Sequence, residues 1–405
     1  MRFPLIIIAL LTVVYLEASA GRFSQRAALH YAAIAHARYD ISMRDAKELQ
    51  ERVNDFLNKP DAESHQAAKD AWLKAHNTYS LTEVFRFGNP NVDAWEGKVN
   101  AWPLDEGYID YVADNYVYHV GNPHARHNII GIAAYPIRDE IIAEYQSGTD
   151  PKEAPSQRMT DIETNVAIGF HAIEFLLWGQ DLNEDQTVGG KRSYTDYLKG
   201  SACTNGNCDR RSKYLSAASR VLVQDLQFMA LDWSPNGRYY KDFVALTSEE
   251  QLWRILTGMG SLSYAELAGE RMRVALIAAD QEEEQNCFSD TTQYSVYYNA
   301  LGIQSLYYGE QKDIDGETIR GVSLSNLVRR YNPDLDEKLR LEFSKTKLIT
   351  TKLLETAAKD MPFDRMILPE NEDQRAVIES VIDALKEQTI TLEAILAEVS
   401  ELAKL

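Results

Sequence analysis

The sequence predicts an all-α protein built from two helical bundles of the four-helix-bundle kind. Apolar residues recur with a period near 3.6 over long windows, which is typical of amphipathic helices. Alternating apolar and polar residues between turns, which would indicate strands, are nearly absent. The chain has 405 residues, and that length is enough for two domains that each bury a sizeable core.

Helical stripes define the regular elements in chain order. A first stripe covers residues 46–57 and ends at Pro60, and a second covers residues 68–79 and ends before Gly88. A further stripe continues over residues 377–402 near the C-terminus. Antiparallel helices bury such stripes against one another, so these segments predict the walls of the bundles.

Three irregular segments interrupt the helical pattern. Residues 87–127 and 286–316 are rich in Gly and Tyr, and residues 180–209 are polar and loop-like. Long irregular segments inside a helical protein are usually functional or packed across other elements. We place the domain boundary in 180–209, so the predicted domains are an N-terminal one over 21–205 and a C-terminal one over 206–405.

The first twenty residues predict a signal peptide. Arg2 is followed by an apolar run from Pro4 to Leu16, and Ala18-Ser19-Ala20 is a small-residue cleavage site. We therefore expect a mature chain that begins near Gly21 and is secreted across the cytoplasmic membrane, to the periplasm or the cell envelope. The alternative is an uncleaved anchor, although the apolar run is short for a span of about 20 residues.

Two of the three cysteines predict a disulfide. Cys203 and Cys208 bracket a turn-rich loop, and an exported compartment permits a disulfide there. The alternative is a metal knuckle, but two thiols without a second pair make a poor zinc site. Cys287 is left over, and we expect it to be buried and inert.

The charge of the chain limits the class of partner. The formal net charge is −19 at pH 7. Nucleic acid is therefore excluded as an expected partner, because phosphate binding depends on patches of Lys and Arg. An acidic protein attracts cations, but that attraction alone does not indicate a specific metal site.

The segment that predicts chemistry is the apolar run 169–178, which contains His171 and Glu174. On a helix, side chains three positions apart lie on one face. Burying both groups without partners is costly, and a metal ion is one partner that satisfies a pair of this kind. The alternative is a core histidine that is satisfied by a hydrogen bond to the glutamate.

Two ligands do not make a metal site, so other carboxylates must converge on the pair. The candidates are Glu83 and Asp105, which both lie beside aromatic residues or helix-breaking residues. Arg86 stands three positions after Glu83 and would orient it, although such a pair is most often an ordinary helical ion pair. Glu266 and Glu270 would join the site if the two halves of the chain face each other.

The sequence supports a catalytic site less well than it supports a metal-binding site. A zinc peptidase needs three protein ligands, an open water position and a general base. His-Glu-x-x-His is absent, and the inverted motif fails because Phe175 follows Glu174. We therefore expect binding rather than catalysis, with a metallopeptidase as the alternative. A third interpretation is a structural or polymer-binding surface protein in which the pair is only a buried hydrogen bond.

At these residues the sequence resembles the imelysin family, also called peptidase family M75. The hallmark Gly-x-His-x-x-Glu stands here as Gly169, His171 and Glu174. Further blocks in the same order resemble the iron-regulated protein A branch; they are 82–88, 102–110, 163–165 and 282–290. The resemblance spans essentially the whole mature chain.

The resemblance implies an extracytoplasmic bacterial protein of two helical-bundle domains with an imelysin-like fold and a site where the domains meet. It implies a role in iron acquisition, with iron or another divalent or trivalent metal ion as the ligand. The implied metal ligands are His171 and Glu174, with Glu83 and Asp105 as further acidic candidates and Arg86 behind them. An iron-transport membrane component is the implied macromolecular partner.

Overall fold

The computed structural model describes residues 5–116, 121–146, 162–182, 189–359 and 361–405, with side chains from Phe23 onward. In those ranges the regular structure is helical, apart from an isolated bridge between Lys312 and Thr318. The all-α prediction is therefore confirmed. The side chains of the predicted signal peptide, residues 1–20, lie outside the described ones. None of the helices searched in the described part of the chain is long and apolar enough to cross a membrane.

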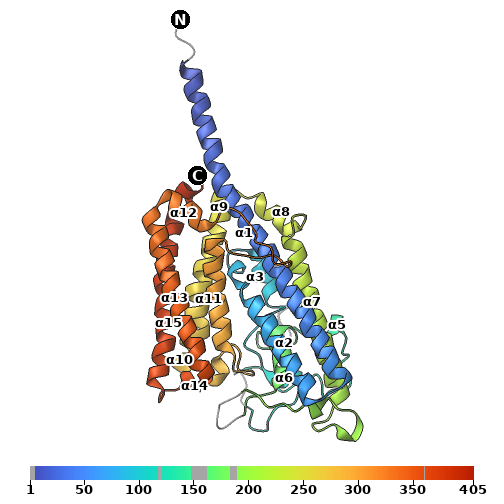
Figure 1. The fold of residues 1–405 in the computed structure, drawn as a ribbon. Coiled ribbons are helices and arrows are strands. Elements are labelled where there is room, and N and C mark those ends of the chain that lie inside the picture. The colour runs from blue at the N-terminus through green and yellow to red at the C-terminus, as the bar shows by residue number, and fades with distance from the viewer. Residues whose placement is uncertain (1–4, 117–120, 147–161, 183–188, 360) are drawn as a thin grey trace.

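The first set of helices is built along α1 (Leu5–Asn58), which packs against α2 (Ala62–Ser80) and α7 (Cys208–Trp233). α6 (Gly169–Trp178) packs against α2 and α7 in turn. Figure 1 shows α1, α2 and α7 as neighbouring rods, with the N-terminal end of α1 extending past the rest of the molecule.

The break between α1 and α2 has a local cause. Pro60 cannot continue a helix, and Asp61 then caps α2 by accepting a hydrogen bond from the Ser64 amide at 2.8 Å. The stripes predicted at 46–57 and 68–79 accordingly lie on α1 and α2, where their apolar side chains are buried in the core.

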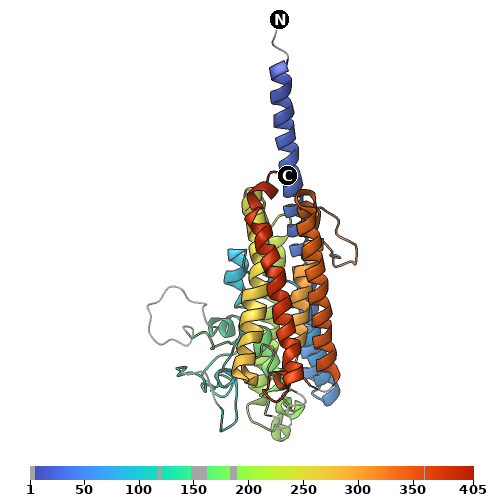
Figure 2. The same ribbon diagram turned by 90° about the vertical axis from the view of Figure 1, so that its left-hand side faces the viewer.

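The second set of helices surrounds α15 (Glu372–Ala397). α15 packs against α9 (Ser248–Gly260), the π-helix η5 (Ser261–Arg273) and α13 (Pro333–Lys359), and α11 (Thr292–Tyr308) packs against α13. Figure 2 shows the long helices of this set side by side with their axes roughly aligned. The apolar stripe predicted over 377–402 lies on α15 and on the short α16 that follows it.

The remaining elements are short and connect or cover the two sets. They are η1 (Glu83–Phe85), α3 (Pro90–Glu96), α4 (Glu106–Ile109), α5 (Asp139–Glu144), η3 (Tyr194–Tyr197), η4 (Gly200–Ala202), α8 (Arg238–Val244), α10 (Val274–Ala278), η6 (Gln281–Glu283), α12 (Leu324–Tyr331), α14 (Phe363–Met366) and α16 (Val399–Leu402).

The two sets meet through α11 against α2 and α9 against α1, while η1 contacts both α9 and α11. Glycine permits the closest approach: a Cβ atom on Gly88 would lie 1.8 Å from the Arg254 carbonyl oxygen. η1 carries Glu83, so a predicted ligand lies where the sets meet. The domain division near residue 205 stays a prediction, since α7 follows it in sequence and packs chiefly along α1.

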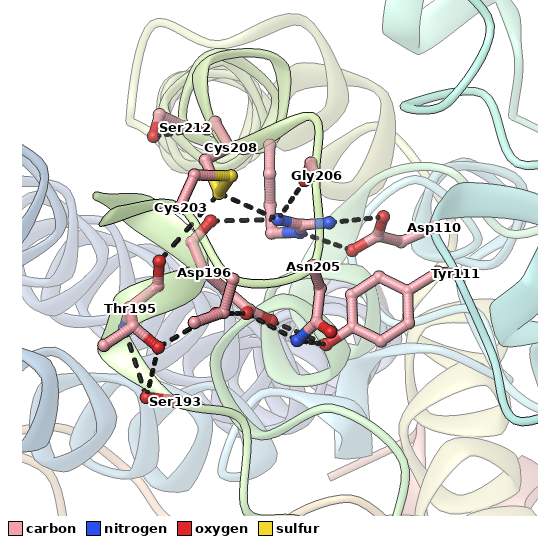
Figure 3. Close-up of a disulfide and its surroundings, with 12 residues drawn as sticks. Asp110, Tyr111, Ser193, Thr195, Asp196, Cys203, Asn205, Gly206, Cys208 and Ser212 are labelled. Carbon is pink, nitrogen blue, oxygen red and sulfur yellow. Dashed lines mark hydrogen bonds and ion pairs between the residues drawn. A yellow bond between two sulfur atoms is a disulfide. The ribbon is translucent and has the colours of Figure 1, made fainter. Parts of the chain in front are cut away.

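The predicted disulfide between Cys203 and Cys208 is confirmed, and Cys287 is buried and free as expected. The disulfide lies at the start of α7 beside Asp196, Asn205 and Asp110 (Figure 3). Arg211, on the first turn of α7, donates Nε to the Asp110 carboxylate at 2.6 Å and Nη1 to the Asp196 carbonyl at 2.9 Å. The disulfide closes a loop in which the Gly206 carbonyl accepts a hydrogen bond from Arg211 at 3.0 Å, and Arg211 is one partner of a buried ion pair.

Candidate metal centre

The hallmark glycine fixes where α6 begins. Gly169 has φ +87°, and a Cβ atom there would lie 2.6 Å from the Val99 carbonyl oxygen. The next amide, that of Phe170, donates a hydrogen bond to the same carbonyl at 2.7 Å. Only glycine adopts this conformation at low cost in so small a space, so the residue positions the first turn of α6 against the 97–99 segment.

The structure brings His171 and Glu174 together on one face of α6. His171 Nδ1 lies 2.9 Å from Glu174 Oε2, and both side chains are buried. The other oxygen of Glu174 accepts hydrogen bonds from the amide and hydroxyl of Ser289, at 3.0 and 2.6 Å. His171 Nε2 is buried and has no hydrogen-bond partner in the described part of the chain.

Burial controls the protonation of the pair. It lowers the pKa of His171 to about 3, with a further contribution from Arg271. It raises the pKa of Glu174 to about 8, against the opposing effect of the Ser289 hydrogen bonds. The imidazole is therefore neutral at pH 7. When its proton is on Nδ1 and points to Glu174, the lone pair on Nε2 is free to bind a cation.

A second histidine lies beside the first. The rings of His76 and His171 are 5.4 Å apart between centroids and almost perpendicular. His76 Nε2 lies 3.0 Å from Asn100 Oδ1, and burial lowers the pKa of His76 to about 4. The His171 imidazole therefore faces a neutral, polar neighbour on α2.

Glu83 reaches this cluster through Asn100, whose side-chain amide donates to Glu83 Oε1 at 3.1 Å. Arg271 on the π-helix engages both oxygens of Glu83, at 2.8 and 2.6 Å. Burial raises the pKa of Glu83, but Arg271 outweighs burial and holds it below the ordinary value. Glu83 is thus an ionised carboxylate paired with a guanidinium.

Arg86, expected to orient Glu83, makes its ion pairs elsewhere. It lies 3.0 Å from Asp93 and 3.3 Å from Glu96. The contact expected from Arg86 is made instead by Arg271, which also pairs with Glu266 at 2.9 Å. Glu266, in the second half of the chain, was expected to join the site. It does enter the cluster, but its link to Glu83 is made by Arg271.

Asp105 belongs to a different hydrogen-bond network. Its carboxylate accepts hydrogen bonds from Tyr116, Asn122 and Thr164. Asn122 donates further to Thr164 Oγ1 at 3.2 Å and to Asn165 Oδ1 at 2.8 Å. Among the residues that the structure describes, no third His, Cys, Asp or Glu completes a group with His171 and Glu174 whose ligand atoms lie within 4.8 Å of one another.

A cleft leads from solvent toward the arginine side of the cluster. Its volume is about 530 Å³, and its lining is mostly polar and charged: Arg86, Lys98, Asn100, Glu163, Glu266, Glu270, Arg271 and Gln285 are among its residues. Asn100 and Arg271 are the two residues that also contact Glu83. The cleft therefore borders two side chains that bind the Glu83 carboxylate, while Glu83 itself is 2% exposed and does not line the cleft.

Four residues of this cluster were not singled out in the sequence: His76, Asn100, Arg271 and Ser289. His76 had a local signal, because it lies in the predicted 68–79 stripe, four positions after Trp72, on which its ring stacks at 4.9 Å. Asn100 and Arg271 come from other elements and had no local signal, whereas Ser289 lies in the 282–290 block that carries part of the family resemblance.

Comparison with known proteins places the chain in a family. The sequence profile of the imelysin family (Peptidase_M75) matches residues 35–392. A 60-residue segment is 30% identical to iron-regulated protein A of Synechococcus elongatus, and the match spans 15% of this chain and 17% of that protein.

Two solved structures share the fold. A candidate iron-regulated protein A precursor from Parabacteroides distasonis is similar with a TM-score of 0.67 and 17% identity, over 92% of this chain and 95% of that one. An imelysin-like protein from Psychrobacter arcticum is similar with a TM-score of 0.57 and 12% identity, over 91% and 93%. Because the family profile spans most of the sequence, the chain belongs to the imelysin family, Peptidase M75.

Proposed function

We propose that this protein is an extracytoplasmic metal-binding protein of bacterial iron acquisition, with iron bound at His171. The observation that carries the proposal is the Nε2 atom of His171, which is buried and has no hydrogen-bond partner among the described residues. Leaving such a group unsatisfied costs about 1–3 kcal/mol. Coordination of a metal by that nitrogen would remove the cost.

Glu174 would support a metal at His171 indirectly, through its contact with the imidazole, before acting as a ligand itself. Burial raises the pKa of Glu174 to about 8, so a metal at Nε2 would have to favour the ionised form of Glu174. That carboxylate then accepts the Nδ1 proton, which fixes the tautomer and makes Nε2 a stronger ligand, as in many carboxylate–histidine–metal sites. Both oxygens of Glu174 already have partners, so it becomes a direct ligand only when one of them is released. An imidazole nitrogen with hard carboxylate oxygens suits iron better than copper(I).

Glu83 is the carboxylate proposed to complete the shell. The charge of Glu83 and the charge of Arg271 both alter the pKa of His171. The Glu83–Arg271 pair and the His171–Glu174 pair are therefore coupled electrostatically. Coordination of a metal by Glu83 would replace the ion pair between Glu83 and Arg271. The Arg271 guanidinium would keep its contact with Glu266. Asp105 would have to leave Tyr116, Asn122 and Thr164 to join the same shell.

The role in iron acquisition draws on the relatives, two of which carry the name iron-regulated protein A. Export is supported by the apolar N-terminus and by the disulfide, which forms in oxidising compartments. An iron-transport component of the membrane is the proposed recipient of the metal.

Titration of metal-free protein with iron tests the proposal. Wild-type protein should bind iron stoichiometrically, and His171→Gln should lose that binding while unfolding at a similar temperature. His124→Gln, which changes a histidine of the 121–127 loop, is the matched control and should bind like wild type. Unchanged binding in His171→Gln would rule out the proposed site.

The same proteins distinguish the metallopeptidase alternative. Cleavage of a broad peptide panel that is lost with chelator and in Glu174→Gln would favour an enzyme over a binding protein. Absence of cleavage together with stoichiometric iron binding is the result expected here.

A further inference from the structure

A second cluster of carboxylates lies outside the histidine site. Asp181 follows α6, Asp290 precedes α11, and Asp364 belongs to α14. One carboxylate oxygen from each lies within 4.8 Å of the other two, and all three residues are buried. Three buried carboxylates at this separation repel one another strongly in a medium of low dielectric constant.

Asp290 gives an independent indication that the cluster holds a ligand. The residue is 6% exposed, and neither of its carboxylate oxygens has a hydrogen-bond partner in the described part of the chain. Its backbone has φ +54°, a left-handed conformation that is unusual outside glycine. The Gln293 side chain donates to the Asp290 carbonyl at 2.9 Å and so fixes this conformation.

Glu284 adds a fourth carboxylate beside the three. It is fully buried, and its pKa is raised well above the ordinary value by burial and then by the charges of Asp290 and Asp364. Arg365 is a cationic group that acts on Asp364, while Glu174 adds a further negative charge near Asp290 and Glu284. Among these described groups the carboxyls outnumber the arginine, and either protons or a cation must neutralise the excess negative charge.

The burial and the chemistry of the ligands indicate which cation would fit. Calcium takes oxygen ligands at 2.3–2.6 Å, so two oxygens on opposite sides of the ion lie about 5 Å apart. Magnesium, with ligands at 2.0–2.1 Å, brings opposite oxygens to about 4 Å. Separations within 4.8 Å admit either ion, but a buried site made of protein oxygens suits calcium better, because magnesium usually keeps several of its waters. The ligands are carboxylate oxygens with no imidazole or thiol, which also favours a hard cation.

One residue of the cluster borders a cavity. Asp290 lines a cavity of about 780 Å³ together with Ser289, Gly189 and Gly190. Lys69, Lys191 and Lys359 line the same cavity, and the Lys69 amine lies over the Trp178 ring at 4.9 Å. The residues described include no ion pair between these lysines and Asp290.

We propose that Asp181, Asp290 and Asp364, with Glu284 beside them, form a cation site for a divalent ion of calcium's size, separate from the site at His171. The ion would connect the end of α6, which belongs to the first set of helices, with α14, which packs on α15 in the second. It would also fix the segment before α11, in which Ser289 holds Glu174. The site thus serves to hold the two sets together around the histidine.

Calcium titration of chelator-treated full-length protein tests the site by calorimetry and thermal unfolding. Wild type should bind one calcium ion, and Tm should rise by about 3 °C at a hundredfold excess over Kd. Magnesium at the same concentration should raise Tm less. Asp290→Asn should abolish the response to calcium, and its Tm without calcium should equal or exceed that of wild type, because the variant relieves repulsion.

Two controls complete the experiment. Asp373→Asn changes an exposed aspartate on α15 and should respond to calcium like wild type. His171→Gln should also keep the calcium response, so failure of the iron site and failure of this one are distinguishable. If Asp290→Asn does not fold, Asp364→Asn serves in its place.

The site would be overturned if stripped wild-type protein gave neither heat nor a Tm shift with calcium, or if both asparagine variants kept the full response. A magnesium response equal to that of calcium would overturn the assignment of ion size.

Discussion

Replacing Arg271 with methionine should destabilise the protein by about 3–5 kcal/mol at pH 7, because the change leaves the Glu83 carboxylate buried without its partner. Arg271 donates to the two oxygens of Glu83 at 2.8 and 2.6 Å. Both side chains are almost fully buried, so solvent ions screen the pair little. Methionine retains most of the aliphatic stem and therefore separates loss of charge from loss of packing.

The size of this loss should depend on pH. In the wild type, burial acts to raise the pKa of Glu83, but Arg271 outweighs it and holds the pKa below 4.5. A group with a depressed folded pKa contributes stability above its unfolded pKa and loses it as the pH falls through the folded pKa. In the variant, burial alone raises the pKa of Glu83, so its contribution is lost as the pH rises. The difference between the two proteins should therefore be larger at pH 7 than at pH 5.

Urea unfolding followed by circular dichroism at both pH values measures the difference by linear extrapolation. Arg220→Met is the matched control, since Arg220 is 40% exposed and pairs with Asp139 at the surface. That variant should lose about 1 kcal/mol or less. A loss below 1 kcal/mol in Arg271→Met, or an equal loss at pH 7 and pH 5, would refute the reasoning.

Three further changes give shorter tests. Ser289→Ala removes the hydroxyl donor to Glu174 and should cost about 1–3 kcal/mol; urea unfolding checks this, and an unaltered midpoint would contradict it. Replacing Cys203 and Cys208 by serine should cost about 2 kcal/mol, because the disulfide closes a short loop; thermal unfolding in oxidising buffer measures the loss, and reductant should affect only the wild type. Gly169→Ala should cost at least about 1–3 kcal/mol through its left-handed backbone; an alanine variant as stable as wild type would show that the start of α6 can move.

The features predicted correctly from the sequence are those with a local cause. The stripes at 46–57, 68–79 and 377–402 identify helices because their period is set by the helix itself. The disulfide was predictable because its cysteines are separated by only 5 positions. His171 and Glu174 were placed together because they lie one turn apart on α6.

The contacts of the candidate site depend on tertiary structure, and the local sequence does not encode them. Arg271 lies 188 positions from Glu83, and Ser289 lies 115 positions from Glu174. Arg86 is the arginine nearest to Glu83 in sequence, but it follows η1 and pairs with Asp93 and Glu96 instead. The aspartate cluster joins three distant segments, so no spacing in the sequence could indicate it.

In the π-helix Ser261–Arg273, the number of residues in the segment determines where its charged side chains point. In an α-helix, Glu266 and Arg271 would lie about 140° apart around the axis, because each residue turns about 100°. The wider turn of a π-helix, with its i to i+5 pattern, places them on one side instead. Deleting one residue between 261 and 273 would rotate Arg271 away from Glu83 even though every side chain of the pair remained. We therefore expect insertions and deletions in this segment to be tolerated far less well than substitutions at its exposed positions.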